Sequence, residues 1–213
     1  MQENIDKNSW KYKIAEQIVA SYGGSEPMSN HIFEKVIIKE LLWHATTMRK
    51  GENENEGMVQ IKYVGQRYWS KKAIEKYIEN NKGTGFKNCK GLIHEHAIPR
   101  NIIKQLIKTS LNKEADKRKQ VKKIHNILNR YSKSVIITKE EDNNIQYKED
   151  FSYKGCQEQF LAENKSKLIE GKEFIDFIIK YRYRRAINEI VDLGAGVTYK
   201  KDFKELIKKR NDL

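Results

Sequence analysis

The chain has 213 residues and a formal net charge of +13 at pH 7, and a third of its residues are charged. This length allows one domain with a sizeable core, and the basic balance favours a polyanionic partner. Cys89 and Cys156 are too few and too far apart for a disulfide framework or a zinc knuckle. Because no apolar run is long enough to span a membrane and the first residues are polar, we expect a cytoplasmic protein.

Apolar spacing predicts the elements of the first third of the chain. Helical periodicity predicts one helix over Trp10–Tyr22 and a second from about Asn30 to Arg49. Alternation of apolar and polar residues predicts a strand over Val59–Tyr63. Ser70 has the chemistry of an N-cap and predicts the start of a third helix, and Trp69 before it is expected in the core.

Two predicted strands enclose two predicted helices in the middle of the chain. The first strand covers Gly91–Ile98, and Pro99 ends it. Apolar stripes then predict helices over Ile102–Leu111 and Val121–Tyr131. The β-branched run Ser134–Thr138 predicts the second strand. Thr138 is expected to cap a short following helix, with Glu141 at the capping-box position.

Helices are also predicted for the last third of the chain, over Phe160–Ile169, from Phe174 to about Val191 and over Asp202–Arg210. The expected fold class is therefore α+β and predominantly helical. Gly194-Ala195-Gly196 follows a predicted helix and lacks a third glycine, so it indicates a turn rather than a dinucleotide site.

Basic residues are concentrated between the two central strands. Residues 100–133 contain 11 Lys and Arg against only Glu114 and Asp116, a balance of +9. This concentration predicts a nucleic-acid surface, and the alternative is a merely solvated helix face.

The segment His94-Glu95-His96 carries the chain's densest chemistry. Imidazole moves protons near neutral pH, and a carboxylate is a ligand for hard cations. A zincin site is excluded because position 98, where its second histidine would stand, is isoleucine. Strand alternation puts His94 and His96 on one face and Glu95 on the other. The two imidazoles could then ligate a transition metal such as a structural zinc, or they could serve the strand alone.

The residues Glu95-His96-Ala97-Ile98-Pro99 resemble the [Asp/Glu/His]-His-x-x-Pro signature of HNH-type, ββα-metal endonucleases. The resemblance covers about residues 89–146 and implies a small ββα-metal site, made of two strands and a helix, embedded among helices. It assigns the general base to His96, with His94 as the alternative. It assigns metal ligation to Glu95 and Asp142, with Asn143 and Glu141 as alternates. The implied ion is Mg²⁺, with Mn²⁺ as an alternative.

We expect three regions: an N-terminal helical region with a short strand (1–85), an HNH-like catalytic core with a basic helical insertion (86–150) and a C-terminal helical region (151–213). The predicted function is metal-dependent hydrolysis of nucleic acid, DNA rather than RNA, by a homodimeric restriction or phage-defence nuclease. The alternative is a non-catalytic nucleic-acid-binding protein, such as a regulator or a defence-system subunit. The residues expected to bind nucleic acid are Arg100, Lys104, Lys108, Lys119, Lys122, Lys123, Arg182, Arg184 and Arg185.

Overall fold

The computed structural model describes residues 9–22, 39–47, 63, 66–82 and 88–145, together with separate positions between 176 and 193. The chain divides into two compact units that alternate along the sequence. One unit combines Met1–Glu52 with Ile98–Lys133, and the other combines Asn53–Ala97 with Ser134–Leu213. None of the described helices is long and apolar enough to cross a lipid bilayer.

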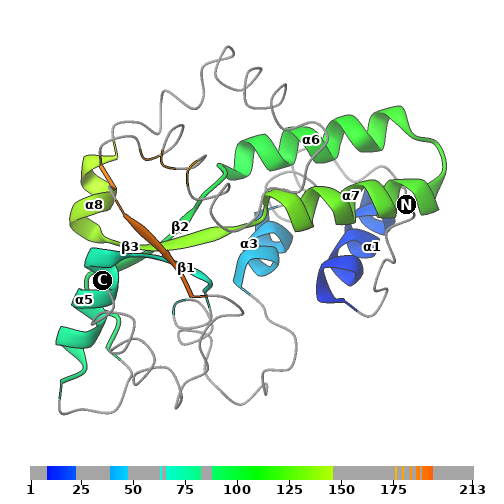
Figure 1. Ribbon diagram of the computed structural model, residues 1–213. Helices are drawn as coiled ribbons and strands as arrows, with labels where there is room; N and C mark the ends of the chain where they lie inside the picture. The colour runs from blue at the N-terminus through cyan, green and yellow to red at the C-terminus, as the bar shows by residue number, and fades with distance from the viewer. Residues whose placement is uncertain are drawn as a thin grey trace. The chain divides into compact units, whose positions relative to one another are not determined.

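The second unit is built on a mixed four-stranded sheet (Figure 1). Its strands are β1 (Tyr68–Ser70), β2 (Leu92–His96), β3 (Ser134–Thr138) and β4 (Ile190–Asp192), in the spatial order β2-β3-β1-β4. Strand β3 pairs antiparallel with β2 and parallel with β1, and β1 pairs antiparallel with β4. This arrangement confirms the α+β class.

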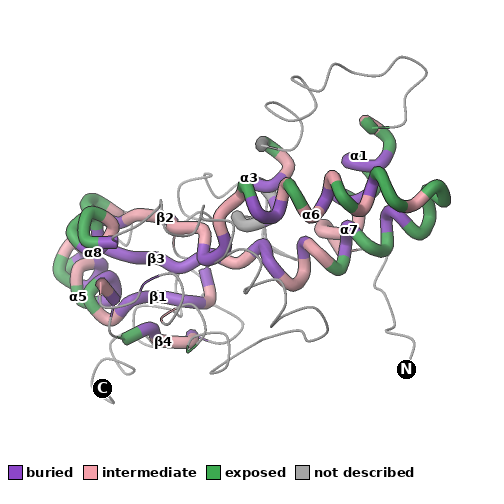
Figure 2. The backbone as a smooth tube through the Cα atoms, turned by 90° about the horizontal axis from the view of Figure 1, so that it is seen from above, coloured by how far each residue is buried: buried purple, intermediate pink, exposed green. Residues whose placement is uncertain are grey.

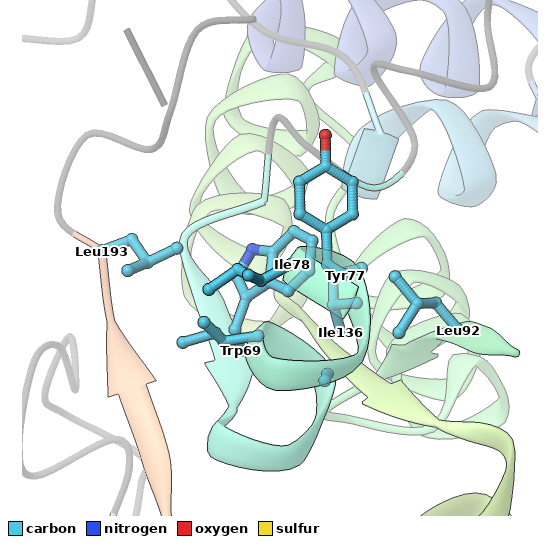
Figure 3. Close-up of a cluster of buried hydrophobic side chains, with 8 residues drawn as sticks. Trp69, Tyr77, Ile78, Leu92, Ile136 and Leu193 are labelled. Carbon is cyan, nitrogen blue, oxygen red and sulfur yellow. The ribbon is translucent and has the colours of Figure 1, made fainter. Parts of the chain in front are cut away.

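Strand β3 lies in the interior, and all five of its residues are buried (Figure 2). Helix α5 (Lys71–Asn80) packs against β1, β2 and β3. It covers one face of the sheet, where Trp69 and Ile136 lie in a cluster with Tyr77 and Ile78 (Figure 3). The other face holds a second cluster, which contains Tyr68, Ala97, Val135, Ile137, Ile145, Tyr183, Ile187 and Ile190. Because both faces are covered, the middle of β3, Val135–Ile137, is continuously apolar rather than alternating.

Two predicted helix starts are confirmed. The Oγ of Ser70 accepts a hydrogen bond of 3.0 Å from the backbone N–H of Ala73 and so caps α5. Helix α8 (Lys139–Asn144) begins with a complete capping box. In it, Thr138 Oγ1 accepts from the Glu141 N–H at 3.1 Å, and the Glu141 carboxylate accepts from the Thr138 N–H at 2.8 Å.

The first unit consists, in its described part, of α1 (Trp10–Tyr22), α3 (Lys39–Thr47), α6 (Arg100–Lys113) and α7 (Lys117–Tyr131). Helix α7 packs against both α1 and α6. Its buried residues recur at helical spacing, as expected of a helix with one face in a core. Gln120 closes the connection between α6 and α7, since its Nε2 donates to the carbonyls of Leu111 at 3.1 Å and Glu114 at 2.6 Å.

Most central elements agree with the sequence prediction, and the differences concern short strands. The predicted helix from Phe174 to about Val191 is wrong at its end, because Ile190–Asp192 forms β4 and pairs with β1. Strand β1 was not predicted, although Trp69 lies in the core as expected. Most of the predicted strand Val59–Tyr63 lies outside the described residues, and its last residue, Tyr63, is helical. The helices predicted over 160–169 and 202–210 also lie outside them.

Candidate functional site

Strand β2 forms one edge of the described sheet and carries the His94-Glu95-His96 segment. Its register with β3 runs from Leu92 opposite Thr138 to His96 opposite Ser134. Strand β3 leads without a break into α8, which packs against both strands. The two strands and this helix therefore form a strand–strand–helix arrangement with the motif at the end of its edge strand.

The two imidazoles lie together on one face of β2. Their ring centroids are 5.4 Å apart and their planes meet at 84°. His94 stands opposite Ile136 and is buried, whereas His96 is half-buried with its Nδ1 atom in the interior. The strand alternation predicted for these residues is thus confirmed. Of the two, His96 is the more accessible.

Glu95 belongs to the opposite face of the strand. It is half-buried and stands opposite Val135, and residues directly opposite in an antiparallel pair share a face. Val135 lies in the same cluster as Ile145, the residue that directly follows α8. Glu95 is therefore on the same face of the sheet as Ile145, at the end of α8. The backbone of β2 separates its side chain from that of His96.

The three candidate ligands of the helix differ in their surroundings. Asp142 is half-buried, with its Oδ1 in the interior, whereas Asn143 is exposed. Glu141 is 4% exposed, and its Oε2 accepts from Ser70 Oγ at 2.6 Å as well as from Thr138. The Glu141 carboxylate is therefore used for hydrogen bonds that stabilise the start of the helix. Asp142 takes no part in the capping box.

Within the part of the chain that the structure describes, no three or more His, Cys, Asp or Glu side chains form a group that could hold a metal ion. The carboxylates of Glu95 and Asp142 still suit a hard cation, which takes few protein oxygens and completes its shell with water and phosphate.

A buried polar pair lies beside the motif and was not predicted from the sequence. Ser134, the cross-strand partner of His96, donates its hydroxyl hydrogen to Oε1 of Gln66. Both side chains are buried, and the backbone carbonyl of Gln66 accepts a hydrogen bond of 2.9 Å from Trp69 Nε1. Because Gln66 and Ser134 are 68 residues apart, no local spacing could have revealed this contact.

The predicted nucleic-acid-binding residues fall into two groups. Arg100, Lys104 and Lys108 lie half-buried on α6, whereas Lys119, Lys122 and Lys123 are exposed on α7. The remaining three, Arg182, Arg184 and Arg185, lie outside the described residues. Tyr183 stands between Arg182 and Arg184 in the sequence. It is buried in the same core cluster as Val135, so its ring contributes to packing.

Cys89 shows no sign of catalytic activation. Burial raises the pKa of its thiol to about 11, and the side chain packs against the α5 side of the sheet. A thiol with such a pKa is almost wholly protonated at neutral pH and is a poor nucleophile.

No known protein family, curated protein or solved structure matches this chain.

Proposed function

We propose that this protein is a metal-dependent endonuclease that hydrolyses phosphodiester bonds, with DNA as its substrate. The observation that carries the proposal is the position of Glu95-His96-x-x-Pro99 at the end of an edge strand. That strand pairs antiparallel with the strand that leads into the helix carrying Asp142. The order and pairing are those that the resemblance to HNH-type endonucleases implies.

His96 is the proposed general base. An imidazole has a pKa suited to accepting a proton from water near neutral pH. His96 is more accessible than His94, whose ring lies edge-on against it and is buried. We therefore assign proton transfer to His96 and positioning of its ring to His94.

Glu95 and Asp142 are the proposed ligands of the ion, with Asn143 as the alternate. Mg²⁺ or Mn²⁺, when bound, supplies positive charge to the scissile phosphate and the leaving oxygen. Glu95 and His96 point to opposite faces of β2, but β2 lies at the edge of the sheet that the described residues form. A phosphodiester lying along that edge can therefore meet both side chains, which it could not do on a central strand.

The second candidate is a non-catalytic nucleic-acid-binding protein. Two observations favour it: the separation of Glu95 from His96 by the strand, and the lack of a three-ligand group among the described side chains. It would use the basic helices and leave the strand pair a structural role. The homodimer and the restriction or phage-defence role belong to the first proposal.

The test is cleavage of supercoiled plasmid DNA by the full chain in Mg²⁺, in Mn²⁺ and in EDTA. Wild type should cut only with a metal ion, and Glu95→Gln and Asp142→Asn should each abolish cutting. Glu140→Gln is the matched control, because Glu140 is exposed on the same helix as Asp142. Cutting that persists in EDTA, or that survives both ligand substitutions, would show that cleavage does not need a metal ion held by Glu95 and Asp142.

A further inference from the structure

The helical unit carries a basic surface that belongs to no part of the strand–strand–helix site. Helix α7 buries Gln120, Val121, Ile124, His125, Leu128 and Tyr131 on one side. At 100° per residue, Lys119, Lys122, Lys123 and Asn126 fall on the opposite side, and all four are exposed. We call these four residues, with Arg118, the α7 basic face.

The acidic residues near this face are already engaged. Glu114 accepts a hydrogen bond of 2.9 Å from Lys123 Nζ, and Asp116 caps α7 by accepting from the N–H groups of Arg118 and Lys119. These are the only acids among residues 100–133, against 11 basic residues. These two acids offset only part of the positive charge, and the segment keeps a balance of +9.

Charge placement on α7 opposes helix stability. Lys117, Arg118 and Lys119 occupy its first turn, which holds no acidic residue, although the helix macrodipole favours acids there. On α7, Lys123 forms an ion pair with Glu114, whereas on α5 three lysines are paired. There, Lys71, Lys72 and Lys76 each form an ion pair with a glutamate. A basic excess of this size, in a place that the helix macrodipole does not favour, indicates a polyanion-binding role rather than a solubilising one.

The face lacks the side chains that bind single strands. Helices α6 and α7 contain one Tyr and no Phe or Trp, and that residue, Tyr131, is buried. Proteins that bind single-stranded nucleic acid use exposed aromatic rings on which bases stack. Lysine ammonium groups instead bind phosphates as point charges, with little dependence on base sequence.

We propose that the α7 basic face binds the phosphate backbone of double-stranded DNA without marked sequence preference. The 15-residue helix is roughly 22 Å long, enough to cross the major groove of B-form DNA, which is about 12 Å wide. The major groove of duplex RNA is too narrow to admit such a helix. This inference names the substrate class of the proposed endonuclease and rests on that proposal only for its connection to cleavage.

The test is fluorescence anisotropy of a labelled 20-base-pair DNA duplex with the full chain in EDTA, over a series of NaCl concentrations. The triple variant Arg118→Gln, Lys119→Gln, Lys122→Gln should bind at least about tenfold more weakly at low salt. Its slope of log K against log salt should be shallower by about two to three, since each phosphate contact contributes about 0.9. Lys122→Glu alone should weaken binding in the same direction.

The matched control is Lys71→Gln, Lys72→Gln, Lys76→Gln, which removes the same charge from α5 and should bind within about twofold of wild type. Equal weakening by both triple variants would reduce the effect to net charge and overturn the assignment to α7. Tighter binding of single-stranded DNA or of duplex RNA, or a strong preference between two unrelated duplexes, would also overturn it.

EDTA separates this inference from the proposed catalysis. Loss of binding in the α7 variant together with no cleavage by wild type in any metal would leave this inference standing and remove the endonuclease. Metal-dependent cleavage with unchanged binding by the α7 variant would do the opposite. Thermal melting followed by circular dichroism checks that each variant is folded.

Discussion

The hydroxyl of Ser70 donates a hydrogen bond of 2.6 Å to Oε2 of Glu141, a residue 71 positions further along the chain. The same Ser70 oxygen caps α5, and the same Glu141 oxygen completes the capping box of α8. One buried contact therefore joins the starts of the two helices and fixes α8 against the sheet. Since α8 carries Asp142, this contact positions the proposed metal ligand as well.

Removal of the Glu141 carboxylate should destabilise the protein strongly. Glu141→Ala leaves the Thr138 N–H and the Ser70 hydroxyl buried without this acceptor, and each lost acceptor costs about 1–3 kcal/mol. We expect a decrease of about 2–4 kcal/mol in the free energy of unfolding, measured by urea denaturation. Glu140→Ala, on the exposed neighbour, should change it by less than about 0.5 kcal/mol. Equal effects would contradict the link.

Strand β3 should be sensitive on both faces. Ile136 lies in the cluster under α5 and Ile137 in the cluster on the other side, and both are fully buried. Ile136→Ala and Ile137→Ala should each lower the free energy of unfolding by about 2–5 kcal/mol. Ile93→Ala, at a half-buried position, should cost less. A near-neutral result for either β3 variant would mean that one face of the sheet is open.

The connection between α6 and α7 should weaken in acid. The hydrogen bond from Lys123 lowers the pKa of Glu114 below 4.5, and a backbone hydrogen bond from Lys119 lowers that of Asp116 below 3.8. Lowered carboxyl pKa values give stability that is fully present above about pH 4.5 and is lost as the pH falls through the folded-state values. The double variant Glu114→Gln, Asp116→Asn should therefore melt below wild type at pH 7 and together with it at pH 2. A constant difference at all pH values would contradict this assignment.

The Cys89 thiol should react slowly with alkylating reagents. At pH 8, a pKa of about 11 instead of 9.0 lowers the thiolate fraction by about a hundredfold. Iodoacetamide labelling of the Cys156→Ser variant, in which Cys89 is the single thiol, should be slow in buffer and fast in urea. Labelling in buffer as fast as that of a cysteine peptide would show that the side chain is accessible and ionises normally.

Local sequence signals predicted the parts of this protein that local chemistry determines. The N-cap at Ser70, the capping box at Thr138 and the shared face of His94 and His96 each depend on residues within a few positions of one another. The three-residue strand β1 could not be predicted in this way, because its structure comes from pairing with distant strands.

The surroundings of the candidate site were also beyond sequence reasoning. Ser134 and Gln66 meet only because β1 and β3 run parallel next to each other, so neither residue signals the other in the chain. Glu141 could be seen as a capping residue and as a metal-ligand alternate at once. Only its contact with Ser70 assigns it to the structure of the helix start.

The most direct test of the proposed catalysis compares wild type, His96→Ala and His94→Ala at saturating plasmid DNA with Mg²⁺ or Mn²⁺. DNA binding is measured separately in EDTA. Loss of a general base costs about 10²–10⁴-fold in rate. His96→Ala should therefore cut at least about a hundredfold more slowly while it binds DNA as wild type does, and His94→Ala should lose less. Cutting by His96→Ala at the wild-type rate would contradict the assignment of the base, and with it the endonuclease site described for this strand pair.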